Sequence, residues 1–161
     1  MRIIKLIIIS FIGLFGILMM ISIFIPSHVR ISRAINIVAP VENIKTQVTD
    51  LRQWKKWNEM ISEGGSYQQT SINAGGVDIT MLKNSPESIE TLWKYKNRKP
   101  VKGSIQLISS RDGITIVQWY FDFHQKWYPW EKFGSILFDK QMGPPMERSL
   151  ENLKKLVENS P

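Results

Sequence analysis

The chain has 161 residues, the length of one ordinary domain, and it lacks cysteine, which excludes disulfides, thiol nucleophiles and thiolate metal sites. Two histidines in the whole chain argue against a zinc site. The formal charge is +7, but once Arg2, Lys5 and Arg30 are set aside, 18 basic side chains face 14 acidic ones. That surplus is far from the dense basic face of a nucleic-acid-binding protein, so we expect no nucleic-acid partner.

The N-terminal segment is uncharged from Leu6 to Ile25, and Pro26 closes it. Twenty helical residues span a hydrocarbon core of about 30 Å. A cleaved signal peptide would have a shorter apolar region and a small-x-small cleavage site, whereas this segment ends in IFIPSHV. The pattern therefore favours an uncleaved transmembrane helix.

Basic residues on the two sides of this segment indicate its orientation. Arg2, Lys5 and the α-amine precede it, and Arg30 and Arg33 follow it. The positive-inside rule places the N-terminus in the cytoplasm by a thin margin. We therefore expect residues 1–30 to be an anchor and tether, and residues 31–161 to form a domain outside the cytoplasmic membrane.

The segments after the anchor alternate between strand and helix signals. Residues 30–38 alternate and are β-branched, which predicts a strand. Residues 41–50 follow Pro40 with helical spacing, and residues 51–57 continue as a short helix or turn. Trp54 and Trp57, three residues apart, share one face of that turn.

A loop containing Gly64-Gly65 precedes four segments with a period of two, at residues 77–83, 88–96, 101–109 and 114–124. Such alternation predicts half-buried antiparallel strands, each with one apolar face. The apolar positions are Val77, Ile79, Met81, Ile89, Trp93, Tyr95, Val101, Ile105, Leu107, Val117, Trp119, Phe121 and Phe123.

The last segment, residues 135–159, has one apolar face at helical spacing, formed by Met142, Met146, Leu150, Leu153 and Val157. Pro144-Pro145 predicts a kink there or a fresh helix start. A run of strands with helices at both ends predicts an α+β fold, with the long helix covering the sheet.

Two stretches resemble a known superfamily. INIVAPVENIKTQVTDLRQWKKW resembles the opening of SRPBCC, or START-like, domains of the polyketide cyclase/dehydrase-like branch. YPWEKFGSILFDKQMGPPMERSLENLKKLVE resembles the loop and closing helix of its membrane-anchored bacterial members. The matching positions of the first stretch are Ile35, Ile37, Ala39, Pro40, Val41, Asp50, Leu51, Trp54 and Trp57.

The resemblance covers residues 31–159 and implies a helix-grip fold, in which a curved antiparallel sheet surrounds a long C-terminal helix. It implies a cavity for a lipid or another hydrophobic or amphipathic small molecule, and it carries over no catalytic residue, metal or cofactor. The expected lining residues are Val77, Ile79, Met81, Trp93, Val117, Trp119, Phe121, Met142 and Met146. The expected rim residues are Trp54, Trp57, Trp127 and Trp130. For Trp54 and Trp57 the alternative, which the sequence favours, is that they pack the helix pair on the sheet.

Three polar or aromatic features leave alternatives open. The aromatic stretch 127–133 plugs one end of the sheet, gates the cavity or contacts the membrane. The basic run 94–102 is a solvated turn or a contact for anionic headgroups. Asp122 and His124, with Glu131 nearby, suit an acid/base group, but their place opposite Trp119 favours a solvated outer face.

The sequence has no Gly-rich phosphate loop, nucleophile elbow or metal cluster, and so it does not predict catalysis. We expect a membrane-anchored domain that binds a hydrophobic small molecule or lipid. The alternatives are a cyclase or dehydratase-like enzyme, and a packed interaction module without a ligand. No protein partner is indicated.

Overall fold

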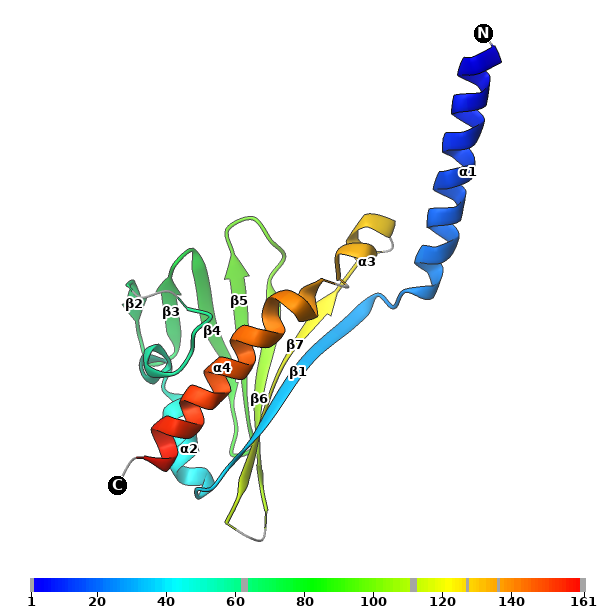
Figure 1. Ribbon diagram of the computed structural model, residues 1–161. Coiled ribbons are helices and arrows are strands. Elements are labelled where there is room, and N and C mark those ends of the chain that lie inside the picture. Colours follow the sequence, from blue (N-terminus) through cyan, green and yellow to red (C-terminus); the bar gives the residue numbers. More distant parts are fainter. Residues whose placement is uncertain (1, 62–63, 111–112, 127, 136, 160–161) are drawn as a thin grey trace.

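The computed structural model describes residues 2–61, 64–110, 113–126, 128–135 and 137–159. A long helix, α1, projects from one end of a domain in which a twisted sheet is crossed by a second long helix, α4 (Figure 1). In chain order the elements are α1 (Arg2–Phe24), β1 (His28–Ile37), α2 (Val41–Thr49), the 3₁₀ helix η1 (Leu51–Lys56), β2 (Ser66–Tyr67), β3 (Ser71–Ala74), β4 (Val77–Asn84), β5 (Ser88–Tyr95), β6 (Val101–Ser109), β7 (Thr115–His124), α3 (Pro129–Ser135) and α4 (Phe138–Glu158).

Within the described residues, seven strands form one antiparallel sheet in the order β1-β7-β6-β5-β4-β3-β2. The predicted α+β helix-grip fold is therefore confirmed. β1 starts at His28, two residues earlier than predicted, because His28 and Val29 pair with His124 and Phe123 of β7. β2 and β3 were not predicted, since the sequence there reads as a loop.

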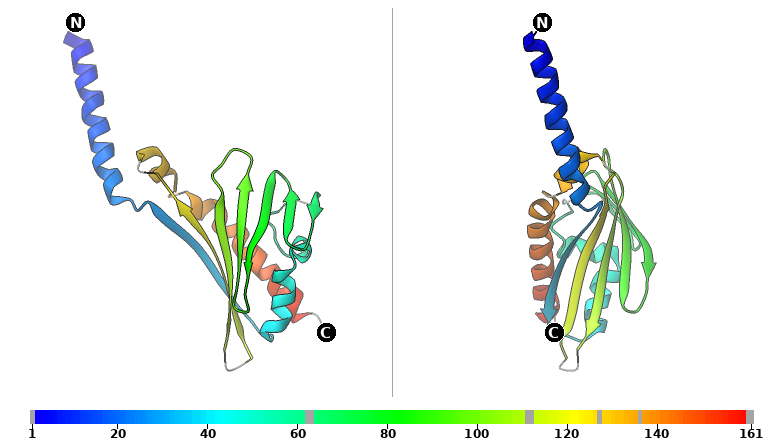
Figure 2. Two further views of the ribbon diagram at one scale, coloured as in Figure 1. Left: turned by 180° about the vertical axis from the view of Figure 1, so that it is seen from behind. Right: turned by 90° about the vertical axis from the view of Figure 1, so that its right-hand side faces the viewer.

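One face of the sheet is covered by helices. α4 lies across β1 and its neighbours, with α2 on the same side, as the edge-on view shows (Figure 2). Met146, Leu150, Leu153 and Val157 of α4 are buried, as the helical spacing predicts. Pro144 and Pro145 lie inside α4, which is one continuous helix, so the fresh start that these prolines suggested is not found.

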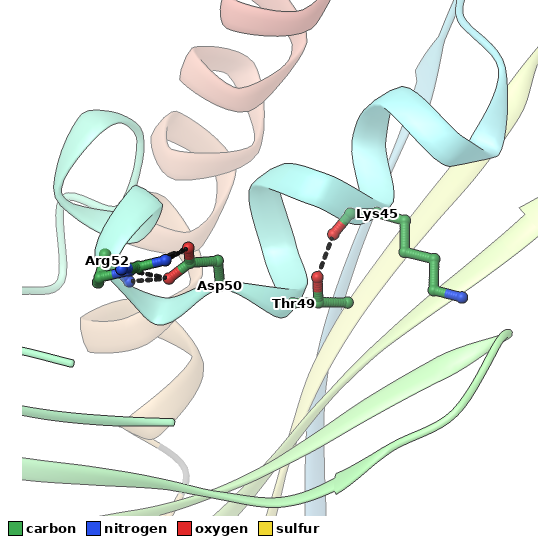
Figure 3. Close-up of polar contacts among 4 residues, drawn as sticks. All are labelled: Lys45, Thr49, Asp50 and Arg52. Atoms are coloured by element: carbon green, nitrogen blue, oxygen red, sulfur yellow. Dashed lines mark hydrogen bonds and ion pairs between the residues drawn. The ribbon is translucent and has the colours of Figure 1, made fainter. Parts of the chain in front are cut away.

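The junction between α2 and η1 directs the chain toward the interior. Asp50 ends α2 in an extended conformation, and its carboxylate accepts a hydrogen bond from the backbone N–H of Arg52 at 3.0 Å, which caps η1. The Arg52 guanidinium also binds this carboxylate, while Thr49 Oγ1 donates to the carbonyl of Lys45 at 2.8 Å (Figure 3). Hydrogen bonding from Arg52 holds the pKa of Asp50 below its ordinary value, although burial opposes this.

Candidate ligand-binding interior

Four indole rings meet between the sheet and the helices. Trp54 and Trp57 come from η1, Trp93 from β5 and Trp119 from β7, and each side chain is at most 1% exposed. The ring centroids of Trp54 lie 5.1 Å from Trp57, 6.1 Å from Trp93 and 6.2 Å from Trp119. Phe121 adds an edge contact to Trp93 at 5.1 Å. These tilted and edge-on ring contacts contribute favourable free energy in addition to that gained by burying apolar surface.

The predicted lining residues all face this interior. Met81 and Met142 are partly buried against it. The other members are buried in the core, namely Val77, Ile79, Trp93, Val117, Trp119, Phe121 and Met146. Their contact with a ligand remains a prediction.

The expected rim residues divide into three cases. Trp54 and Trp57 lie at the centre of the indole cluster rather than at its edge, because η1 turns both rings inward. Trp130 is 64% exposed on α3, outside the core. Trp127 lies outside the described residues.

Three of the four indole N–H groups have protein acceptors, and the fourth has none in the part of the chain that the structure describes. Trp54 donates to the carbonyl of Val48 at 2.9 Å, and Trp57 to that of Gln47 at 3.3 Å. Trp93 donates to Thr91 Oγ1 at 3.0 Å, whereas the buried N–H of Trp119 finds no acceptor among the described residues. An unpaired buried donor costs about 1–3 kcal/mol.

Other polar atoms inside the domain are also unpaired among the described residues. The Asn58 amide nitrogen, directly after η1, and Gln47 Oε1, on α2, have no hydrogen-bond partner there. Asn58 Oδ1 accepts from the N–H of Met60 at 2.9 Å, which fixes the amide with its nitrogen unpaired. Nothing in the sequence pattern predicts these unpaired atoms, because they depend on how the elements pack.

An arginine on the inner face of β1 fastens the N-terminal half of α4. Arg33 Nε donates to Glu147 at 2.6 Å, and Arg33 Nη2 donates to Asp139 at 2.9 Å. Burial disfavours the charge, but these hydrogen bonds outweigh it and raise the Arg33 pKa above its ordinary value. We call Arg33, Asp139 and Glu147 the Arg33 clasp. The sequence contained one sign of it, because Arg33 is a charged residue at a position that alternates in phase with the inward-facing Ile31 and Ile35.

Two hollows lie away from the indole cluster. One, of about 340 Å³, includes Asp78, Thr80 and Lys94 on the outer side of β4 and β5, with Ile79 also at its wall. The other, of about 540 Å³, lies between Lys56 and the last turns of α4. Side chains occupy the indole interior in this structure, so a ligand there requires the rings or α4 to shift.

The acidic and histidine side chains at the end of β7 lie on the outer face, as predicted. Asp122 accepts two hydrogen bonds from Arg30, at 2.7 and 2.9 Å, and lies 3.2 Å from His28 Nε2. The hydrogen bonds from Arg30 lower the Asp122 pKa, although burial opposes this. Glu131, the third member of the imagined acid/base group, instead binds Lys99 at 2.7 Å.

Comparisons with known proteins place the fold among existing ones. Residues 28–158 match the family model described as polyketide cyclase / dehydrase and lipid transport. A START superfamily protein from Mycobacterium smegmatis is 15% identical, with a TM-score of 0.59 over 80% of this chain and 97% of that one. CalU16 from Micromonospora echinospora is 17% identical, with a TM-score of 0.58 over 82% and 76% of the two chains.

A third solved structure is a truncated norcoclaurine synthase from Thalictrum flavum. It is 10% identical, with a TM-score of 0.64 over 83% of this chain and 96% of that one. At these identities the likeness concerns the fold. Among curated proteins, none matches this sequence.

Proposed function

Because the chain belongs to the polyketide cyclase / dehydrase and lipid transport family, we propose that it binds a hydrophobic or amphipathic small molecule, such as a lipid, between the sheet and α4. The observation that carries this proposal is the buried indole N–H of Trp119, which lacks an acceptor among the described residues. A core that serves packing alone gains nothing from an unpaired donor. A ligand with an apolar body and one carbonyl, hydroxyl or carboxylate oxygen would bury apolar surface and satisfy it.

The proposal includes a membrane anchor. In the part of the chain that the structure describes, one helix, α1, is long enough and apolar enough to cross a bilayer. Its apolar side chains are exposed along its length. We propose that residues 1–30 anchor and tether the domain, that residues 31–161 form it, and that it lies outside the cytoplasmic membrane with the N-terminus inside.

The test is native mass spectrometry of the full-length protein released in mild detergent, compared with Trp119→Phe and Trp93→Phe. Both substitutions remove one fully buried indole, so they create similar space. Only the first removes the donor that we assign to the ligand. We expect a discrete small-molecule adduct in the wild type and in Trp93→Phe, and loss of that adduct in Trp119→Phe.

Other outcomes of this measurement contradict the proposal. A clean apo mass, repeated after incubation with a membrane lipid extract, would favour a packed interaction module. Equal adduct retention by Trp119→Phe would show that its N–H does not hold the ligand.

An enzymatic role is the second candidate, since a synthase shares the fold. Asp122 and His124 lie on the outer face and do not serve an interior reaction. Tyr95 follows Trp93 on the inner face of β5, and burial raises its pKa, so its phenol stays protonated and can donate a hydrogen bond. Turnover of a bound ligand that stops in Tyr95→Phe would support this candidate.

A further inference from the structure

The short helix α3 is hydrogen-bonded to the C-terminal end of α1, the end that leads into the domain. Lys132 Nζ donates to the backbone carbonyl of Ser22 at 3.0 Å, and the two residues are 7% and 3% exposed. The last carbonyls of a helix lack intrahelical partners, and a cation is favourable there. α3 therefore lies where α1 ends.

The linker between α1 and the sheet is too short to separate the domain from a bilayer. α1 ends at Phe24 and β1 starts at His28. The N–H of Gln125, just after β7, donates to the carbonyl of Ser27 at 2.7 Å. If α1 spans the membrane, as the proposed function holds, this end of the domain touches the headgroup region.

α3 and its flanks expose aromatic and apolar surface at this end. Trp130 is 64% exposed and stacks on Tyr128, with ring centroids 5.0 Å apart and planes at 4°. Leu137, just before α4, is 51% exposed. Tryptophan and tyrosine favour the membrane interface because each ring has an apolar body and a polar tip.

The turn between β5 and β6 brings positive charge to the same end. This turn and α3 lie at the end from which α1 rises (Figures 1 and 2), and the ion pair of Lys99 with Glu131 at 2.7 Å joins them. Lys96 and Arg98 are exposed on the turn, and Lys126 is exposed beside Tyr128. The net positive charge complements a bilayer that contains anionic lipid.

We propose that this end of the domain is a membrane-docking surface for anionic lipid headgroups, formed by Lys96, Arg98, Lys126, Tyr128, Trp130 and Leu137. The surface rests on α1 being a membrane anchor, but it does not depend on any ligand in the interior. It holds α3, and with it the start of α4, at the bilayer.

Single-cysteine labelling tests this surface directly, because the chain contains no cysteine. Full-length protein carrying Leu14→Cys, Trp130→Cys or Ser110→Cys would be labelled with a nitroxide and reconstituted into vesicles. Phosphatidylcholine vesicles would be compared with vesicles in which about one quarter of the lipid is phosphatidylglycerol. Collisions with oxygen, which partitions into lipid, and with a water-soluble nickel chelate would report the depth of each label.

We expect the label at position 14 to be lipid-embedded, the label at 130 to be shielded from nickel, and the label at 110, at the far end of the sheet, to be fully accessible. Shielding at 130 should increase with phosphatidylglycerol. It should fall when Lys96→Gln and Arg98→Gln are added, and not with Lys55→Gln and Lys83→Gln, which remove two exposed charges elsewhere.

The outcomes separate the two proposals. An embedded label at 14 with a nickel-accessible label at 130 in both vesicles would overturn the docking surface and leave the anchor intact. A nickel-accessible label at 14 would overturn the anchor itself. If the label at 130 is equally shielded from nickel in both kinds of vesicle, and also with Lys96→Gln and Arg98→Gln, the assignment to anionic headgroups would be overturned.

Discussion

Two helical glycines differ in what surrounds them. A methyl group on Gly143 would meet the guanidinium of Arg33, whereas a methyl group on Gly134 would find open space. The Arg33 guanidinium cannot move aside freely, because Asp139 and Glu147 hold it in place. The space over Gly143 is therefore part of the clasp between β1 and α4.

We expect Gly143→Ala to lower the free energy of unfolding by about 1–3 kcal/mol, as overpacking does. Gly134→Ala is the matched control and should gain up to about 1 kcal/mol from helix propensity. Thermal and urea unfolding in detergent, followed by tryptophan fluorescence, would measure both. If Gly143→Ala and Gly134→Ala stabilise the protein equally, the Arg33 clasp contributes nothing to the free energy of unfolding.

The ion pair of Arg30 with Asp122 predicts a specific dependence on pH. The lowered pKa of Asp122 means that the pair stabilises the fold fully above the ordinary aspartate value of about 3.9. This stabilisation is lost as the pH falls through the lower pKa of the folded state. The melting temperature of Asp122→Asn should therefore fall less than that of the wild type between neutral pH and about pH 3.

The control for this measurement is Glu87→Gln, which removes one exposed carboxylate from a turn. Parallel melting curves for Asp122→Asn and the wild type across the acid range would contradict the assignment to Asp122.

The sequence predicted which strand residues point inward, but it did not predict how the indoles meet. Period-two alternation placed Trp93 and Trp119 on the inner face, because a strand turns alternate side chains the same way. The central position of Trp54 and the unpaired N–H of Trp119 depend on packing between segments far apart in the chain. Arg33 was left out of the predicted site, since its partners lie on α4.

At the scale of elements, the long periodic segments were predicted well and the short ones were not. β4 to β7 and the apolar face of α4 follow from alternation and helical spacing. β2 and β3 have two and four residues, too few to show a period. The helix α3 lies in the stretch that the resemblance assigned to the loop before the closing helix, and Pro129 stands at its first position, where a proline is tolerated.

The cap at the start of η1 can be tested by two substitutions of one residue. Asp50→Ala removes the acceptor for the Arg52 N–H and should cost about 1 kcal/mol of unfolding free energy. Asp50→Asn keeps a capping oxygen and should cost less, although it loses the ion pair. Because η1 carries Trp54 and Trp57, near-ultraviolet circular dichroism should weaken more in the alanine variant. An equal loss in both variants would assign the effect to charge rather than to the cap.

At the scale of the whole molecule, the proposed orientation has a direct test. A phosphatase that is active only outside the cytoplasmic membrane, fused after Pro161, should be active. A fluorescent protein that matures only in the cytoplasm, fused at the same place, should stay dark. The reverse pattern would place the domain in the cytoplasm, as the thin margin of flanking charge allows.

The pairing of β1 with β7 sets an order for biosynthesis. β1 follows α1 directly, yet its partner strand comes late in the chain, and Arg30 and Asp122 are 92 residues apart. During translation β1 leaves the ribosome early and, if α1 anchors the chain as we propose, stays beside the bilayer as an unpaired edge until β7 has been made. The nascent domain therefore spends most of its synthesis with an open strand, which is the state in which chaperones bind and misassembly starts.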